Sequence, residues 1–112
     1  TEGLAIGQFE TADLADNLDD ALEPLDVAFI GSLDLSIAAG RPGEPSAREV
    51  RALIERVERS AHRIGRHLGI FAANPSAARE AVASGYRYVA VSADLSLLRQ
   101  GGTDLVDAVR RP

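Results

Sequence analysis

Four short apolar runs divide the chain, and each is bounded by turn residues. None of them alternates strictly between apolar and polar positions, and nearly continuous apolar strands are typical of parallel sheets buried on both faces. The pattern therefore predicts four parallel β-strands, at residues 4–9, 27–30, 68–72 and 88–91.

A segment in which apolar residues recur at helical spacing follows each predicted strand. The order along the chain is therefore βαβαβαβα, and such alternation predicts parallel strands joined by right-handed helical crossovers. The fold class that we expect is α/β, with helices at residues 12–23, 47–66, 75–84, 95–100 and 103–110.

Local signals set the boundaries of these helices. Ser46 and Glu49 have the S-x-x-E spacing of a capping box, after a loop expected at residues 38–45. Asn74 is expected to cap the next helix, whose first position is Pro75. A pair of glycines at residues 101–102 is expected to break the C-terminal segment into two helices.

Composition narrows the chemistry that this chain can perform. The 112 residues are 46% apolar and 26% charged, as in an ordinary globular domain, and the net charge is −5. All twelve Lys and Arg positions are Arg, so the chain offers no lysine amine for a Schiff base. Cysteine is absent as well, which excludes disulfides and thiolate metal ligands.

The same composition bears on partners and location. An acidic chain without a basic block is a poor binder of nucleic acid, so no nucleic-acid partner is expected. The chain shows no apolar run of membrane-spanning length and no signal-peptide pattern. We therefore expect no membrane partner and a cytoplasmic location.

Two carboxylates follow the first two predicted strands. Glu10 ends the first strand and Asp34 lies just beyond the second. Functional groups gather at the carboxyl ends of parallel strands. Carboxylates on neighbouring strands repel each other unless a cation lies between them, and a shared Mg²⁺ would bring them within about 5 Å. The pattern equally allows Glu10 to cap a helix that begins at Ala12 and Asp34 to end a turn.

Gly31 stands at the end of the second predicted strand. A glycine there lets a ligand approach the backbone closely. The amides of Ser32, Leu33 and Asp34 could then face a small anion. A plain tight turn is the alternative explanation of Gly31.

The segments around these residues resemble the metal-dependent pyruvate aldolases of the HpcH/HpaI family. Residues 8–11, QFET, are similar to that family's Q-I-E-T segment, and residues 29–36, FIGSLDLS, are similar to its F-I-G-P-x-D-L-S segment. Residues 41–43, RPG, resemble its G-x-P-G loop, and residues 89–98, VAVSADLSLL, resemble its V-A-V-G-x-D-x-S-L-L close. The two acidic motifs also have the family's spacing, so the resemblance covers nearly the whole chain.

This resemblance implies that residues 1–112 form a single half-barrel domain, the C-terminal half of a (β/α)8 TIM barrel. It implies that Glu10 and Asp34 bind a divalent metal ion, Mg²⁺, Mn²⁺ or Co²⁺, and that Gly31, Ser32 and Leu33 cradle the carboxylate of pyruvate. The implied reaction is reversible aldol cleavage of a 4-hydroxy-2-oxo acid to pyruvate and an aldehyde, with the metal stabilising an enolate. Citrate-lyase-like or malyl-CoA-lyase-like carbon–carbon cleavage is the related alternative.

The chain departs from the family pattern at Ser32, where the family usually has Pro. The family's enolate-neutralising Arg and proton-transferring His belong to the first four βα units, so we assign no catalytic residue here. The alternative from another class is therefore a non-catalytic half-barrel, as a scaffold or a split-gene partner subunit.

A half-barrel has two unpaired sheet edges, which invite pairing with another chain. Partners expected for this one are the missing N-terminal half-barrel or a second copy of the chain. The family's oligomers imply a homo-oligomer with a further contact through residues 95–110.

Overall fold

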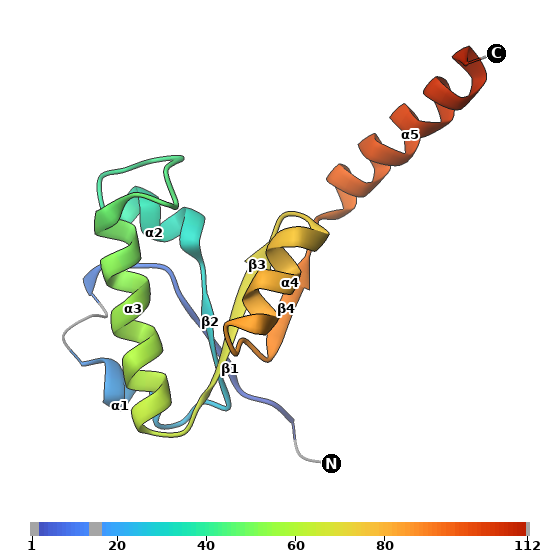
Figure 1. Cartoon of the computed structure of the whole chain (residues 1–112). Coiled ribbons are helices and arrows are strands. Elements are labelled where there is room, and N and C mark those ends of the chain that lie inside the picture. The colour runs from blue at the N-terminus through green and yellow to red at the C-terminus, as the bar shows by residue number, and fades with distance from the viewer. Residues whose placement is uncertain (1–2, 14–16, 112) are drawn as a thin grey trace.

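The computed structural model describes residues 3–13 and 17–111. Its centre is one parallel sheet of four strands, which are β1 (Ile6–Phe9), β2 (Val27–Ile30), β3 (His67–Ala72) and β4 (Tyr88–Val91). The strands lie in the order β1-β2-β3-β4, and all three neighbouring pairs are parallel. The predicted parallel sheet is therefore confirmed, and its strands lie side by side in the order in which they occur along the chain (Figure 1).

Five helices accompany these strands in the described part of the chain. They are α1 (Leu18–Leu22), α2 (Ser32–Ala38), α3 (Arg48–Arg63), α4 (Pro75–Ala83) and α5 (Asp94–Arg110). Helix α3 packs against β2, β3, α1 and α2, whereas α4 packs against β3 and β4. Helix α5 projects away from the sheet (Figure 1).

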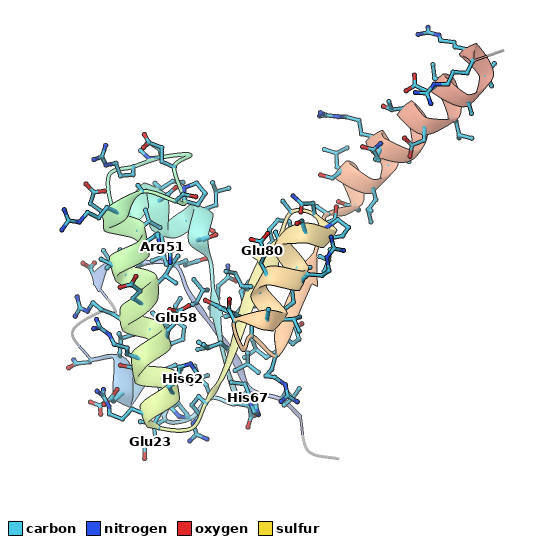
Figure 2. All side chains as sticks on the ribbon, in the orientation of Figure 1. Glu23, Arg51, Glu58, His62, His67 and Glu80 are labelled. Atoms are coloured by element: carbon cyan, nitrogen blue, oxygen red, sulfur yellow. The ribbon has the colours of Figure 1, made fainter. Side chains whose placement is uncertain are left out.

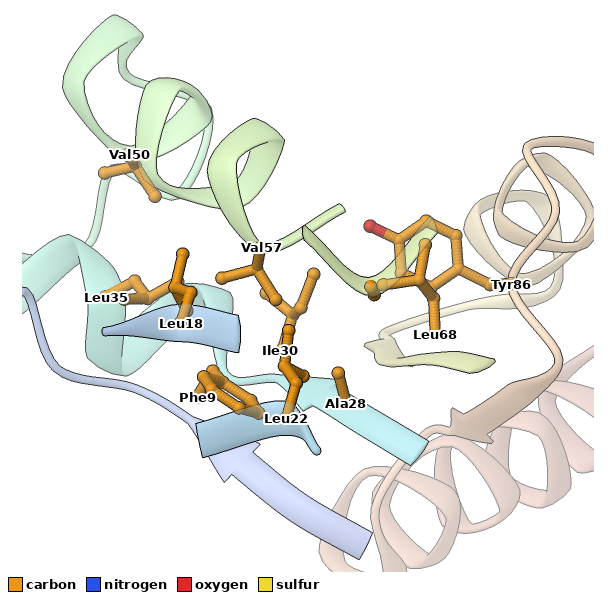
Figure 3. Packing of buried hydrophobic residues seen from close by; sticks show 11 residues of the cluster. Phe9, Leu18, Leu22, Ala28, Ile30, Leu35, Val50, Val57, Leu68 and Tyr86 are labelled. Carbon is orange, nitrogen blue, oxygen red and sulfur yellow. The ribbon is translucent and has the colours of Figure 1, made fainter. Parts of the chain in front are cut away.

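The hydrophobic core lies between the sheet and its covering helices (Figure 3). Because side chains alternate across a strand, each strand sends one set of residues toward the helices. The strands contribute Phe9, Ala28, Ile30 and Leu68 to this core, and the helices add Leu18, Leu22, Leu35, Val50, Val57 and Ala61. The apolar runs of the sequence therefore face helices α1 to α4.

Among the described residues, no helix covers the opposite face of the sheet. Ile6, Phe71 and Tyr88 remain 40–46% exposed there. Gly69 leaves room on this face for the ring of Phe29, which meets the ring of Tyr88 edge to face with the centroids 5.9 Å apart. This face therefore carries aromatic and aliphatic surface of the kind that fills the interior of a barrel.

Two predictions about the first half of the chain need correction. The predicted helix at residues 12–23 is realised only as α1, and residues 14–16 of it lie outside the described residues. The sequence predicted no helix where α2 begins, one residue after β2 ends. Helix α2 forms because Leu35 and Ser36 are buried beside α3.

Of two predicted N-terminal helix caps, one is confirmed and one is wrong. Asn74 caps α4 as predicted, and its side chain accepts a hydrogen bond from the Ala77 amide at 3.0 Å. The predicted capping box is wrong, because the N-cap of α3 is Ala47, without a side-chain cap bond. Glu49 instead accepts a hydrogen bond from Arg41 at 2.8 Å.

The predicted break at residues 101–102 is also wrong, because α5 runs without interruption from Asp94 to Arg110. A helical glycine costs only about 1 kcal/mol relative to alanine. Side-chain bonds span the glycine pair: Gln100 donates to Asp104 at 2.7 Å, and the Thr103 hydroxyl donates to the Arg99 carbonyl at 3.0 Å. Thr103 thus lies inside the helix and does not cap a new one.

Over the described ranges, none of the helices has the length and apolar character needed to cross a membrane.

Candidate functional site

The candidate site lies where the carboxyl ends of β1 and β2 meet. Phe9 is paired with Ile30, so the next residues, Glu10 and Gly31, leave adjacent strands at the same level. The Gly31 amide donates a hydrogen bond to the Phe9 carbonyl at 3.0 Å, which carries the pairing one residue past β2. The two residues are therefore held beside each other by the register of the sheet.

The missing side chain of Gly31 leaves a notch that three polar residues surround. A Cβ placed on Gly31 would stand 3.2 Å from the Cβ of Glu10, 3.3 Å from Nε2 of Gln8 and 3.4 Å from Oδ2 of Asp34. These atoms come from β1, from the residue after it and from α2. A larger residue at position 31 would thus intrude on the space between the two carboxylate side chains.

The first turn of α2 faces the same edge. Helix α2 begins at Ser32 with Gly31 at its N-cap, and the first helical hydrogen bond runs from the Leu35 amide to the Gly31 carbonyl at 2.9 Å. The amides of Ser32, Leu33 and Asp34 therefore have no acceptor within the helix. The turn therefore has three N–H groups without a helical acceptor, and its Asp34 places a carboxylate oxygen beside the notch.

The predicted site residues divide into side-chain and backbone contributors. Glu10, Gly31 and Asp34 lie side by side at this edge. Ser32 and Leu33 bring backbone amides, and the side chain of Leu33 is exposed. The separation of about 5 Å between the two carboxylates stays a prediction.

The local alternatives for the two acids have different outcomes. Helix α1 begins at Leu18 with Asn17 as its N-cap residue, so Glu10 does not cap that helix, and residues 14–16 of the helix predicted from Ala12 lie outside the described residues. Asp34 lies in the first turn of α2, where a carboxylate also interacts favourably with the helix N-terminus. A role of the two acids as metal ligands therefore stays a prediction.

Gln8 belongs to the QFET segment, but the sequence did not predict it as a residue of the site. It precedes Glu10 by two positions, and residues two apart on a strand point to the same face. That spacing is the signal that could have placed its amide beside the carboxylates.

The histidines lie elsewhere. Both His62 and His67 are exposed, His62 in α3 and His67 at the first position of β3, which is the end of the strand opposite the notch (Figure 2).

The donor set at the notch suits one kind of metal. In the part of the chain that the structure describes, no group of three or more His, Cys, Asp or Glu residues could hold an ion. Two carboxylates and an amide are hard donors, and Mg²⁺ is bound in proteins through one or two carboxylates, with waters and substrate oxygens completing its shell. The residues therefore fit a hard divalent cation and not a structural zinc, which takes four protein ligands.

Fold and site together define an α/β barrel segment with two carboxylates and a helix N-terminus at its strand ends. The family model described as HpcH/HpaI aldolase/citrate lyase matches residues 4–101. The chain therefore belongs to the HpcH/HpaI aldolase/citrate lyase family.

Curated relatives carry aldolase names. A hydroxypyruvate/pyruvate aldolase of Chromohalobacter salexigens is 37% identical over 82 residues, which are 73% of this chain and 32% of that protein. A 5-keto-4-deoxy-D-glucarate aldolase of Klebsiella pneumoniae is 34% identical over 106 residues, which are 93% of this chain and 41% of that protein. The chain thus spans 32% and 41% of the length of these two relatives.

Solved structures of the same family also match nearly the whole of this chain with less than half of their own length. An HpcH/HpaI aldolase/citrate lyase family protein from Burkholderia cenocepacia superposes with a TM-score of 0.85 at 33% identity, over 94% of this chain and 42% of that one. An HpcH/HpaI aldolase from Desulfitobacterium hafniense gives a TM-score of 0.81 at 25% identity, over 96% and 42%. The predicted fold class is confirmed: the chain is α/β, with four βα units from the C-terminal part of a TIM barrel.

Proposed function

We propose that this chain carries the metal- and substrate-binding edge of a carbon–carbon lyase that reversibly cleaves a 4-hydroxy-2-oxo acid to pyruvate and an aldehyde. The observation that carries the proposal is the notch at Gly31, around which Glu10, Gln8 and Asp34 converge at the carboxyl ends of β1 and β2. The aldolase names of relatives with 34–37% identity support the same reaction class.

Each residue of the edge has a proposed role. Glu10 and Asp34 hold a divalent cation, for which Mg²⁺, Mn²⁺ and Co²⁺ are the candidates. When bound, such an ion supplies Lewis-acid stabilisation of the negative charge that develops on the 2-oxo group. The amides of Ser32 and Leu33 donate to the substrate carboxylate, and Gly31 leaves the space that this carboxylate occupies.

Proton transfer is not assigned to a residue of this chain. The residues around the notch are two acids and a glutamine. The two histidines lie in the last turn of α3 and at the amino end of β3, away from the notch. We propose that residues 1–112 form one half-barrel domain and that the acid–base groups come from the part of the barrel that faces the uncovered side of the sheet. That part is either the N-terminal half-barrel or a second copy of this chain, within a homo-oligomer. The cytoplasmic location stays a prediction.

The proposal is tested first by metal binding. Mn²⁺ titration of the chain, followed by electron paramagnetic resonance of the free ion, is expected to show one site that pyruvate tightens. Glu10→Gln should weaken the affinity by about tenfold or more, since even residues behind metal ligands contribute that much. The matched control is Glu23→Gln, an exposed carboxylate just past α1 (Figure 2) that precedes the amino end of β2, whereas the notch lies at its carboxyl end. Equal Mn²⁺ affinity in the wild type and Glu10→Gln contradicts the proposed site.

The reaction itself is tested by pyruvate release from a 4-hydroxy-2-oxo acid, with Mn²⁺ and after chelation. Release that requires both the metal and Glu10 supports the lyase. Metal binding without release by the chain alone is expected if the acid–base groups come from the N-terminal half-barrel. Metal binding without release even after that half-barrel is added favours the alternative of a non-catalytic half-barrel.

A further inference from the structure

Two polar side chains are buried in the described core, and one of them adjoins the candidate site. Ser36 of α2 is 0% exposed and Ser60 of α3 is 7% exposed. The Ser36 hydroxyl donates to the Leu33 carbonyl at 2.6 Å and accepts from the Gly43 amide at 3.2 Å. Both capacities of this buried hydroxyl are therefore used, as burial of a polar group requires.

The bond to Leu33 bears directly on the first turn of α2. The peptide between Leu33 and Asp34 is planar and trans, so its carbonyl and its N–H point in opposite directions. A hydroxyl that holds the Leu33 carbonyl on the buried side thus also fixes the direction of the Asp34 amide. That amide is one of the three N–H groups of this turn without a helical acceptor, and its residue carries the carboxylate that lies beside the notch.

The hydrogen bond from the Gly43 amide connects the loop after α2 to the same Ser36 hydroxyl. Residues 40–43 leave α2 and turn back over it, with φ of 71° at Gly40 and 79° at Gly43. The Arg41 amide donates to the Ser36 carbonyl at 2.7 Å, so the loop contacts both the backbone and the side chain of Ser36. One buried residue therefore connects the loop to the turn that bears Asp34.

We infer that Ser36 is a positioning residue of the site, whose hydroxyl clamps loop 40–43 onto α2 and so fixes the Leu33–Asp34 peptide. This inference rests on the proposed function, because the peptide matters for binding only if Asp34 is a ligand. Ser36 itself is fully buried and acts through Leu33, not through contact with a ligand.

The variant that tests the inference is Ser36→Ala, which removes the hydroxyl with little change of volume. Its matched control is Ser60→Ala, since Ser60 is the other buried serine and its hydroxyl accepts a bond from Arg63 at 3.3 Å, on α3. Mn²⁺ affinity should fall about tenfold in Ser36→Ala, the size typical of residues that orient metal ligands, and should not change in Ser60→Ala. A wild type and a Ser36→Ala variant with the same Mn²⁺ affinity overturn the inference.

A second readout does not depend on the metal. Amide hydrogen exchange of the metal-free chain should become faster at Leu35, whose amide donates to the Gly31 carbonyl, and at residues 41–43 together in Ser36→Ala, and at neither place in Ser60→Ala. Unchanged exchange at Leu35 overturns the inference even if the loop is released. If the wild type binds no Mn²⁺, the proposed function fails, and the exchange data alone then decide whether Ser36 holds this turn.

Discussion

Helices α2 and α5 both begin just past the carboxyl end of a strand, yet they are held in opposite ways. Helix α2 has only seven residues, but Leu35 belongs to the core (Figure 3), and Ser36 is buried as well. Helix α5 has seventeen residues, none of which is buried, and it projects from the end of β4 (Figure 1). Length therefore does not determine which helix is fixed to the sheet.

The hydrogen bonds of the two helices show the reason. The bonds that bridge the glycines of α5 come from α5 itself, through Gln100 and Thr103. The bonds that hold α2 arrive from the loop after it, through the amides of Arg41 and Gly43. A residue in α2 is thus fixed by tertiary contacts, which suits a turn that must present Asp34 at a defined place, whereas α5 depends on its own local bonds.

The largest test of this difference compares one leucine in each helix. Leu35→Ala should lower the free energy of unfolding by about 2–5 kcal/mol, because it removes a side chain that is 2% exposed from the core. Leu98→Ala should change it by less than about 0.5 kcal/mol, because Leu98 is 75% exposed on α5. Urea denaturation monitored by circular dichroism measures both. An equal loss in the two variants would show that another chain covers α5 in solution.

The next test fills the notch beside α2. Gly31→Val should lower the free energy of unfolding by about 1–3 kcal/mol, because its Cβ meets Glu10, Gln8 and Asp34 at 3.2–3.4 Å. It should also abolish the effect of pyruvate on Mn²⁺ binding. Gly3→Val is the control, because a Cβ there has open space within 4 Å. Undiminished pyruvate binding in Gly31→Val would refute the role of the notch.

The same contrast explains what the sequence could and could not predict. The four strands were predictable because each is a dense apolar run. Helix α2 was not, because its apolar residues Leu33, Leu35 and Ile37 recur every second position, which is the period of a strand. Burial of Leu35 and Ser36 against α3 outweighs that pattern, and no local feature of the sequence predicts this burial.

The part of the site that lies directly at the strand ends could be predicted from the sequence. Parallel strands bring their carboxyl ends together, so the proximity of Glu10 and Gly31 followed from the apolar runs alone. The place of Asp34 within a helical turn did not follow, because α2 itself was missed. Ser36 could not be singled out either, since burial of a serine hydroxyl depends on the loop that folds back over it.

A smaller effect is expected from the glycines of α5. Gly101→Ala should stabilise the helix locally by about 1 kcal/mol, because a Cβ there meets no atom within 4 Å and alanine is the better helix former. Hydrogen exchange within α5 should become slower, while the urea midpoint of the whole chain should stay unchanged. A rise of that midpoint would show that α5 is coupled to the core and would remove the contrast with α2.

The smallest effect concerns the loop that anchors α2, and it depends on pH. The hydrogen bond from the Arg41 guanidinium holds the pKa of Glu49 below its ordinary value of 4.5. Because this pKa is lowered in the folded state, the pair stabilises the fold above pH 4.5, and the stabilisation is lost as the pH falls through the folded-state pKa. Glu49→Gln should therefore lower the melting temperature slightly at pH 7 and not at pH 2.

Both side chains of the Arg41–Glu49 pair are exposed, so salt should also reduce the difference in melting temperature at pH 7. Glu55→Gln, an exposed change on the same helix, should show little difference at either pH. A Glu49→Gln deficit that persists unchanged at pH 2 would mean that the Arg41–Glu49 pair does not hold this loop.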